Sequence, residues 1–183
     1  LHSFPTRRSS DLFHRIYYKT DVYKKSKKID EKCFYVDLEF ILYPLKYVKT
    51  ARFLDYNIYM YRLGIDGQSV SVESCIRNKD NFRMVLNSLC KYVSEENLQN
   101  EVKNYIIRRI NAFSATIAAV YFLMGNKKEA NDFYQSLIEN VKRQYPDVYN
   151  HFNSKKFKLS KLMCYKGYGI KRMILKLSGN LKL

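Results

Sequence analysis

Three amphipathic segments in the second half of the chain constrain the fold most strongly. In each of them apolar residues recur at three- and four-residue spacing, which places their side chains on one face of an α-helix. The segments cover 82–93, 102–124 and 130–141, and Gly125-Asn126 interrupts the pattern between the last two. Because an amphipathic helix must bury its apolar face against another element, these segments predict a helical bundle.

The first half of the chain has a mixed pattern. Residues 15–19 are rich in strand-forming side chains, 24–32 form a charged connection, and apolar spacing from Asp37 to Val48 indicates a helix that Pro44 bends. Residues 51–63 alternate between apolar and polar side chains and predict a strand, which Gly64 and Gly67 follow in a turn-rich loop. The expected fold class is therefore α+β and mainly α.

Composition excludes several classes of site. The 183 residues are 46% hydrophobic and 15% aromatic, which favours one globular domain over a disordered chain. The four cysteines are scattered without a C-x-x-C pair, and the histidines after residue 12 are His14 and His151. This pattern argues against a structural zinc site or a histidine-based catalytic centre, and it favours reduced thiols in the cytoplasm.

The charge is strongly basic and unevenly distributed. The formal net charge is +16, and residues 155–183 hold nine Lys or Arg and no acid. Within this tail an apolar face is flanked by Lys171, Arg172 and Lys176. Such a segment is typical of a helix lying on an anionic membrane surface, and the alternative is a last helix packed on the core. We therefore expect a cytoplasmic protein, with peripheral attachment to the inner face of the cell membrane if the tail binds lipid.

The first twelve residues follow neither a helical nor a strand pattern. They include Phe4-Pro5, two arginines and Ser9-Ser10-Asp11, with no apolar run of signal-peptide length. Residues 2–12 are similar to the conceptual translation of a common sequencing adapter. The alternative is a disordered basic arm. We therefore expect residues 1–12 to be non-native and a natural N-terminal part to precede Phe13.

Three motifs between about residues 15 and 71 occur in a recognisable order. They are RIYYKTDVYKK, FYVDLEFILYPL and YMYRLGIDGQSVS. This stretch resembles the C-terminal part of the catalytic domain of bacterial glycosyltransferase family 2, which has the GT-A fold. The expected organisation is then a GT-A remainder over 13–75, a helical region over 76–154 and the basic tail over 155–183.

The resemblance implies an inverting transfer of a sugar from a nucleotide-sugar to a glycan or lipid-linked acceptor, in cell-surface polysaccharide synthesis. It places Asp37 at the general-base position and Glu39 at a second acidic position that orients neighbours or the acceptor. Arg62 at the end of the expected strand, together with Gln68 and Ser69 in the loop that follows it, would approach the diphosphate or the acceptor. The chain departs from the family pattern at Val36, where the family often has Glu.

Structural roles compete with these assignments. Aspartate is a preferred helix N-cap, so Asp37 could serve only to cap the following helix. Arg62 and the loop after it could instead form a hairpin-like turn in which the arginine is exposed. The resemblance also implies Mg²⁺ or Mn²⁺ bound through an Asp-x-Asp motif, and no such motif occurs here. We therefore expect the metal ligands of the full-length enzyme to lie upstream of Phe13.

A rival function comes from the helical region. Residues 112–141 read like one tetratricopeptide-type helix pair, and such repeats form interaction modules without catalysis. We find no second copy at that period, so a single helical hairpin is predicted. The apolar run 112–124 is short and interrupted by Ser and Thr, which favours a core helix over a membrane span. No RNA- or DNA-binding signature supports a nucleic-acid partner.

Overall fold

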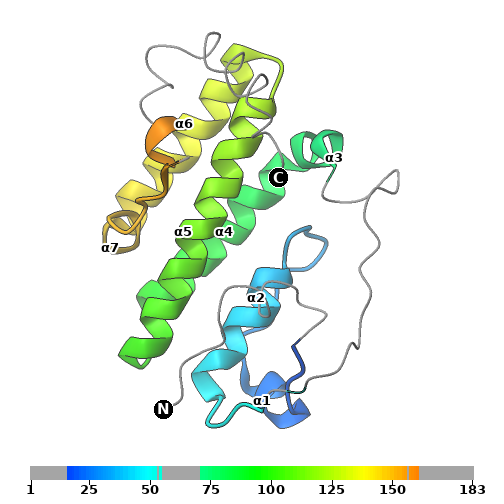
Figure 1. Cartoon of the computed structure of the whole chain (residues 1–183), viewed down its shortest axis with the longest axis vertical. Coiled ribbons are helices and arrows are strands. Elements are labelled where there is room, and N and C mark those ends of the chain that lie inside the picture. Colours follow the sequence, from blue (N-terminus) through cyan, green and yellow to red (C-terminus); the bar gives the residue numbers. More distant parts are fainter. Residues whose placement is uncertain (1–15, 53, 55–70, 156, 161–183) are drawn as a thin grey trace.

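The computed structural model describes residues 16–52, 54, 71–155 and 157–160, and within them every regular element is a helix. Three long helices lie side by side: α4 (Lys79–Glu95), α5 (Asn100–Leu123) and α6 (Lys127–Gln144) (Figure 1). They coincide with the three predicted amphipathic segments. A mainly helical fold is therefore confirmed, as is the hairpin of α5 and α6 around Gly125.

The core lies on both sides of α5, which contacts α4 and α6 along its length. Fully buried side chains from α5 include Ile106, Ile110, Ile117 and Tyr121. The other two helices each bury one stripe against it, with Phe82, Val85, Leu86 and Leu89 from α4 and Phe133, Leu137 and Val141 from α6. This arrangement explains why α5 is the most apolar of the three.

Of the described helices, α5 is long and apolar enough to span a membrane by length and composition alone. In the fold, however, 61% of its most apolar window is buried inside the protein. Buried residues on more than one face of α5 pack against protein, which is the environment of a core helix.

Short helices precede the bundle. They are α1 (Thr20–Lys25), α2 (Asp37–Leu42), the 3₁₀ helix η2 (Tyr43–Tyr47) and α3 (Val72–Arg77). Helix α2 begins at Asp37, as predicted. Pro44, the second residue of η2, coincides with a change from α to 3₁₀ geometry, since proline cannot donate the next helical hydrogen bond. Helices α2 and α3 contact α4 and α5 respectively, which seats the first half of the chain on the bundle.

The predicted strand at 15–19 is wrong for its described part. Residues 16–19 form no regular element and lead into α1, which the sequence pattern did not predict. The Tyr18 hydroxyl donates to the carbonyl of Ile41 at 2.6 Å, so this segment is held to α2 by a side chain. A strand needs a neighbouring backbone with which to pair, and propensity alone does not supply one. Most of the predicted strand at 51–63 lies outside the described residues.

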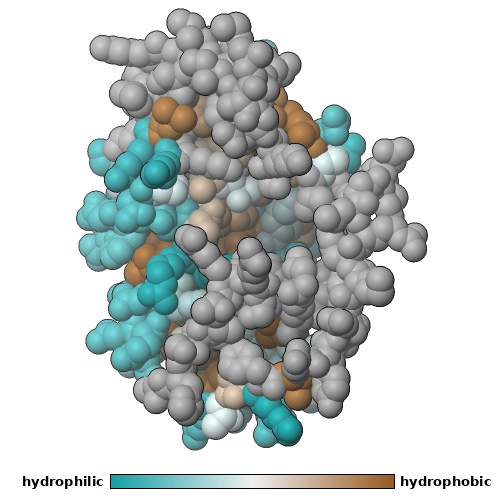
Figure 2. Space-filling model, in the orientation of Figure 1, coloured by the Kyte–Doolittle hydropathy of each residue, from teal (hydrophilic) through white to brown (hydrophobic). Residues whose placement is uncertain are grey.

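A further short helix, α7 (Pro146–Tyr149), contacts α4 and α6 at one end of the bundle. The Asn111 side chain on α5 donates to Asn153 Oδ1 at 2.8 Å and accepts from the backbone N–H of Asn153 at 3.1 Å, which fixes the chain that follows α7. The edge of the molecule along α6 and α7 carries mostly hydrophilic side chains (Figure 2). The visible face of this edge therefore resembles ordinary solvated protein surface.

Candidate functional site

Asp37 is the first residue of α2, and its side chain is exposed. Val36 occupies the N-cap position, and no side-chain hydrogen bond caps the helix there. The alternative in which Asp37 is the N-cap is therefore wrong, because Asp37 lies one position inside the helix. An exposed carboxylate in the first turn is accessible to a ligand and is favourably placed in the field of the helix.

Glu39 lies on the opposite side of α2, because two residues correspond to about 200° of rotation around a helix. Its side chain is buried, with an exposed fraction of 0%. One carboxylate oxygen, Oε2, accepts a hydrogen bond of 2.7 Å from the backbone N–H of Asp30. The other oxygen, Oε1, is buried with no hydrogen-bond partner among the described residues. Glu39 thus contacts the loop before α2.

The environment of Glu39 changes its acidity. Burial is the main cause that raises the pKa of this carboxyl to about 7; the nearby Asp30 charge adds to the shift, and the hydrogen bond from the Asp30 backbone and the charge of Lys27 oppose it. Burial, together with the charges of Glu39 and Asp30, also raises the pKa of the Tyr43 hydroxyl. The carboxyl of Glu39 therefore changes its charge near neutral pH inside the protein.

This shift predicts that stability falls as the pH rises. The pKa of Glu39 is about 7 in the folded chain against an ordinary value of 4.5 for a solvated glutamate, so the folded state binds more protons between these pH values. The free energy of unfolding should fall by up to about 3 kcal/mol between pH 4.5 and 7 because of this residue, and then level off. Glu39→Gln should remove this part of the pH dependence in urea unfolding at pH 5 and pH 8.

Glu31→Gln is the matched control, because Glu31 is an exposed glutamate in the loop before α2. It should keep the wild-type pH dependence. An unchanged difference between pH 5 and pH 8 in Glu39→Gln would show that the buried carboxyl does not titrate in this range.

Asp30 connects this carboxylate to the bundle. The Ser88 hydroxyl on α4 donates to Asp30 Oδ2 at 2.7 Å. Lys27 Nζ donates to the Tyr43 hydroxyl at 3.4 Å and lies 4.9 Å from the centre of its ring. We call Asp30, Glu39, Tyr43 and Ser88 the acid cluster. It brings two carboxylates together under α2, and Asp37 lies on the outer side of the same helix.

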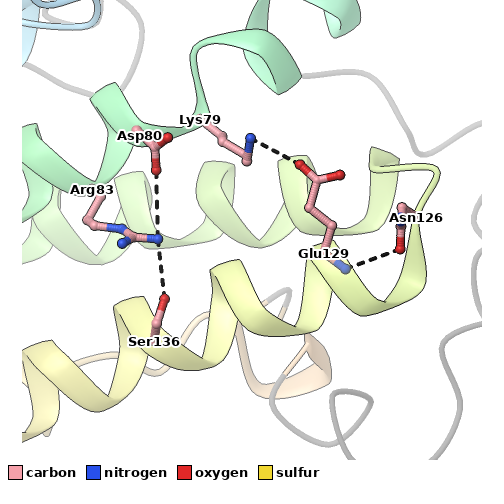
Figure 3. Close-up of polar contacts among 6 residues, drawn as sticks. All are labelled: Lys79, Asp80, Arg83, Asn126, Glu129 and Ser136. Atoms are coloured by element: carbon pink, nitrogen blue, oxygen red, sulfur yellow. Dashed lines mark hydrogen bonds and ion pairs between the residues drawn. The ribbon is translucent and has the colours of Figure 1, made fainter.

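A second polar region lies between α4 and α6 (Figure 3). Arg83 on α4 donates to the Ser136 hydroxyl on α6 at 3.2 Å and lies 3.7 Å from a carboxylate oxygen of Asp80. Lys79 and Glu129 form an ion pair of 3.1 Å across the same two helices. An open hollow of about 550 Å³ adjoins Arg83 and is also lined by Ser136, Glu139, Asn140 and Arg143. Charges of both signs line this surface, so it favours neither anions nor cations.

The other predicted site residues lie outside the described residues. They are Arg62 with Gln68 and Ser69 of the loop over 64–71, and three residues of the basic tail: Lys171, Arg172 and Lys176. Among the residues that the structure describes, no group of three or more His, Cys, Asp or Glu side chains is placed to hold a metal ion. The described part of the chain thus places Asp37 and Glu39 on opposite faces of one helix and connects Asp30 and Ser88 to Glu39.

Comparison with known proteins finds no match: no protein-family model, no curated protein and no solved structure is similar to this chain. Any function for the chain is therefore inferred from its residues and their geometry.

Proposed function

We propose that this chain is the acceptor-side part of a longer inverting glycosyltransferase similar to family 2, with Asp37 as the general base. The observation that supports this most is the placement of the two acids of the FYVDLEF segment. Asp37 is exposed at the start of α2, and Glu39 is buried beneath the same helix. One carboxylate is thus accessible for proton transfer while the other holds the helix in place.

The proposed reaction uses the exposed carboxylate in the usual way for a general base. A sugar hydroxyl has a pKa far above neutral and needs a base within hydrogen-bond reach as its oxygen attacks. Asp37 would accept that proton while the hydroxyl oxygen forms a bond to the anomeric carbon. The bond to the nucleoside diphosphate breaks on the opposite side, and the configuration at this carbon is inverted.

The donor is a nucleotide-sugar, and the acceptor is a glycan or a lipid-linked glycan. The divalent metal that the family resemblance implies, Mg²⁺ or Mn²⁺, finds no suitable ligand group among the described residues. We therefore place its ligands in the proposed upstream part and derive no step through it. Arg62 and the loop with Gln68 and Ser69 remain proposed contacts of the diphosphate or the acceptor.

The upstream coding sequence offers a direct test. In an overlapping genomic read, extension of the frame before Phe13 should give a βαβ pattern that ends in an Asp-x-Asp motif. A helical repeat array there would instead support the rival function, in which α5 and α6 belong to an interaction module. A stop codon close to Phe13 would contradict both.

The basic tail supports a cytoplasmic enzyme that contacts the inner face of the membrane. We expect the chain to bind vesicles that contain phosphatidylserine, and to lose this binding as salt is raised. Replacing Lys171, Arg172 and Lys176 with glutamine should weaken the binding by about 1 kcal/mol per residue in a sedimentation assay. Lys103→Gln and Lys128→Gln, at exposed positions on α5 and α6, are the controls. Equal binding by the tail variant would contradict a membrane role for these three residues.

A further inference from the structure

The segments on either side of α2 are attached to α4 by two contacts between residues that are far apart in the chain. The Tyr92 hydroxyl on α4 donates to the backbone carbonyl of Tyr43 at 2.9 Å, and the two rings lie 4.6 Å apart. The Ser88 hydroxyl, one helical turn earlier on α4, reaches Asp30 in the loop before α2. The first contact holds the end of the helical segment, and the second holds the loop that leads into it.

The second contact continues as far as α2 itself. Ser88 Oγ donates to Asp30 Oδ2 at 2.7 Å, and the backbone N–H of Asp30 donates to Glu39 Oε2 at 2.7 Å. Glu39 is fully buried and lies two residues after Asp37. A short series of hydrogen bonds therefore connects α4 to the helical turn that starts with Asp37.

Electrostatics make the Ser88 hydroxyl important in this series. The negative charges of Asp30 and Glu39 repel each other, and this repulsion adds to the larger effect of burial on the pKa of the Glu39 carboxyl. A hydroxyl that donates to Asp30 stabilises its negative charge on the side that faces α4. Without that donor, the partly buried Asp30 carboxylate would lose a partner beside the buried carboxyl of Glu39. The loop and the backbone N–H that it offers to Glu39 would then be free to shift.

We propose that Ser88 is a positioning residue for Asp37 and acts through Asp30 and Glu39. The helical region after residue 75 then contributes to proton transfer indirectly, by holding the base in position. This inference depends on the proposed function, because it assigns Asp37 the role of the base. Neither the sequence motifs nor the family resemblance points to Ser88, whose partner Asp30 is 58 residues away in the chain.

The coupling can be measured in this chain by amide hydrogen exchange. In Ser88→Ala, the exchange of the Asp30 amide, which donates to Glu39 Oε2, should be at least about tenfold faster, because the loop has lost its contact with α4. Ser88→Thr, which keeps the hydroxyl, should restore slow exchange. Ser136→Ala removes a hydroxyl on α6 that contacts Arg83 and serves as the control. Unchanged exchange at Asp30 in Ser88→Ala would overturn the inference, and this result would not depend on whether the chain is part of a glycosyltransferase.

The catalytic part of the inference is tested in the longer enzyme. We expect Ser88→Ala to lower kcat about tenfold with an unchanged KM for the nucleotide-sugar, because a misplaced base slows the chemical step. Ser88→Thr should recover most of that loss. A wild-type kcat in Ser88→Ala, beside an inactive Asp37→Asn, would overturn the role of Ser88 and leave the proposed function standing. An inactive wild-type enzyme would overturn the proposed function and this inference with it.

Discussion

Asp37→Asn is expected to reduce sugar transfer by the longer enzyme by a factor of about 10²–10⁴. The amide has nearly the shape of the carboxylate but cannot accept a proton near neutral pH. Because Asp37 is exposed at the first position of α2, its replacement should leave the fold intact. The measurement compares initial rates of transfer from a radiolabelled nucleotide-sugar, with circular dichroism as the check on folding.

Asp21→Asn is a matched control for this experiment. Asp21 is also an exposed aspartate in the first turn of a six-residue helix, α1. Both substitutions remove one negative charge from the first turn of a six-residue helix, so a loss of activity specific to Asp37→Asn would not be a general effect of charge at a helix start. Activity retained in Asp37→Asn would mean that this carboxylate serves only the structure of α2.

Phe82→Ala is expected to cost about 3–5 kcal/mol of unfolding free energy. The Phe82 side chain on α4 is 1% exposed. Its ring stacks on Tyr35 with centroids 3.9 Å apart and lies 5.6 Å from the ring of Phe113 on α5. Truncation would thus leave a cavity where α4, α5 and the segment before α2 meet. Urea unfolding followed by circular dichroism measures the effect.

Met84→Ala provides the comparison on the same helix. Met84 is 47% exposed and points away from the core. Its truncation should change the unfolding free energy by less than about 0.5 kcal/mol, as is usual at surface positions. Similar effects of the two substitutions would contradict the packing at Phe82. A loss confined to Phe82→Ala would show that the first half of the chain is bound to the bundle through this ring.

Much of the helical architecture follows from periodicity. The apolar stripes at 82–93, 102–124 and 130–141 are long and regular. In each of them, helical spacing places the apolar side chains on one face. The start of α2 at Asp37 was also predictable, from the apolar spacing that follows it. Helix α1 and residues 16–19 were not, because six residues carry too little periodic signal and strand propensity depends on a partner.

The candidate site also has a part that the sequence predicts and a part that it does not. Asp37 and Glu39 are visible in the sequence as neighbouring acids, and a helical register already places them on opposite faces. A glutamate directly before the apolar pair Phe40-Ile41 is a signal for burial that the sequence hypothesis did not use. The contact of Asp30 with Ser88 joins two elements 58 residues apart, and no local pattern encodes it.

The central claim is that the chain belongs to an inverting glycosyltransferase, and the stereochemistry of the product tests it most directly. The longer protein would be incubated with a panel of α-linked nucleotide-sugars and a polysaccharide acceptor, and the product examined by proton NMR. We predict a new glycosidic bond with β configuration, formed by the wild-type protein and absent with Asp37→Asn. A product with retained α configuration, or no transfer from any donor, would contradict the claim.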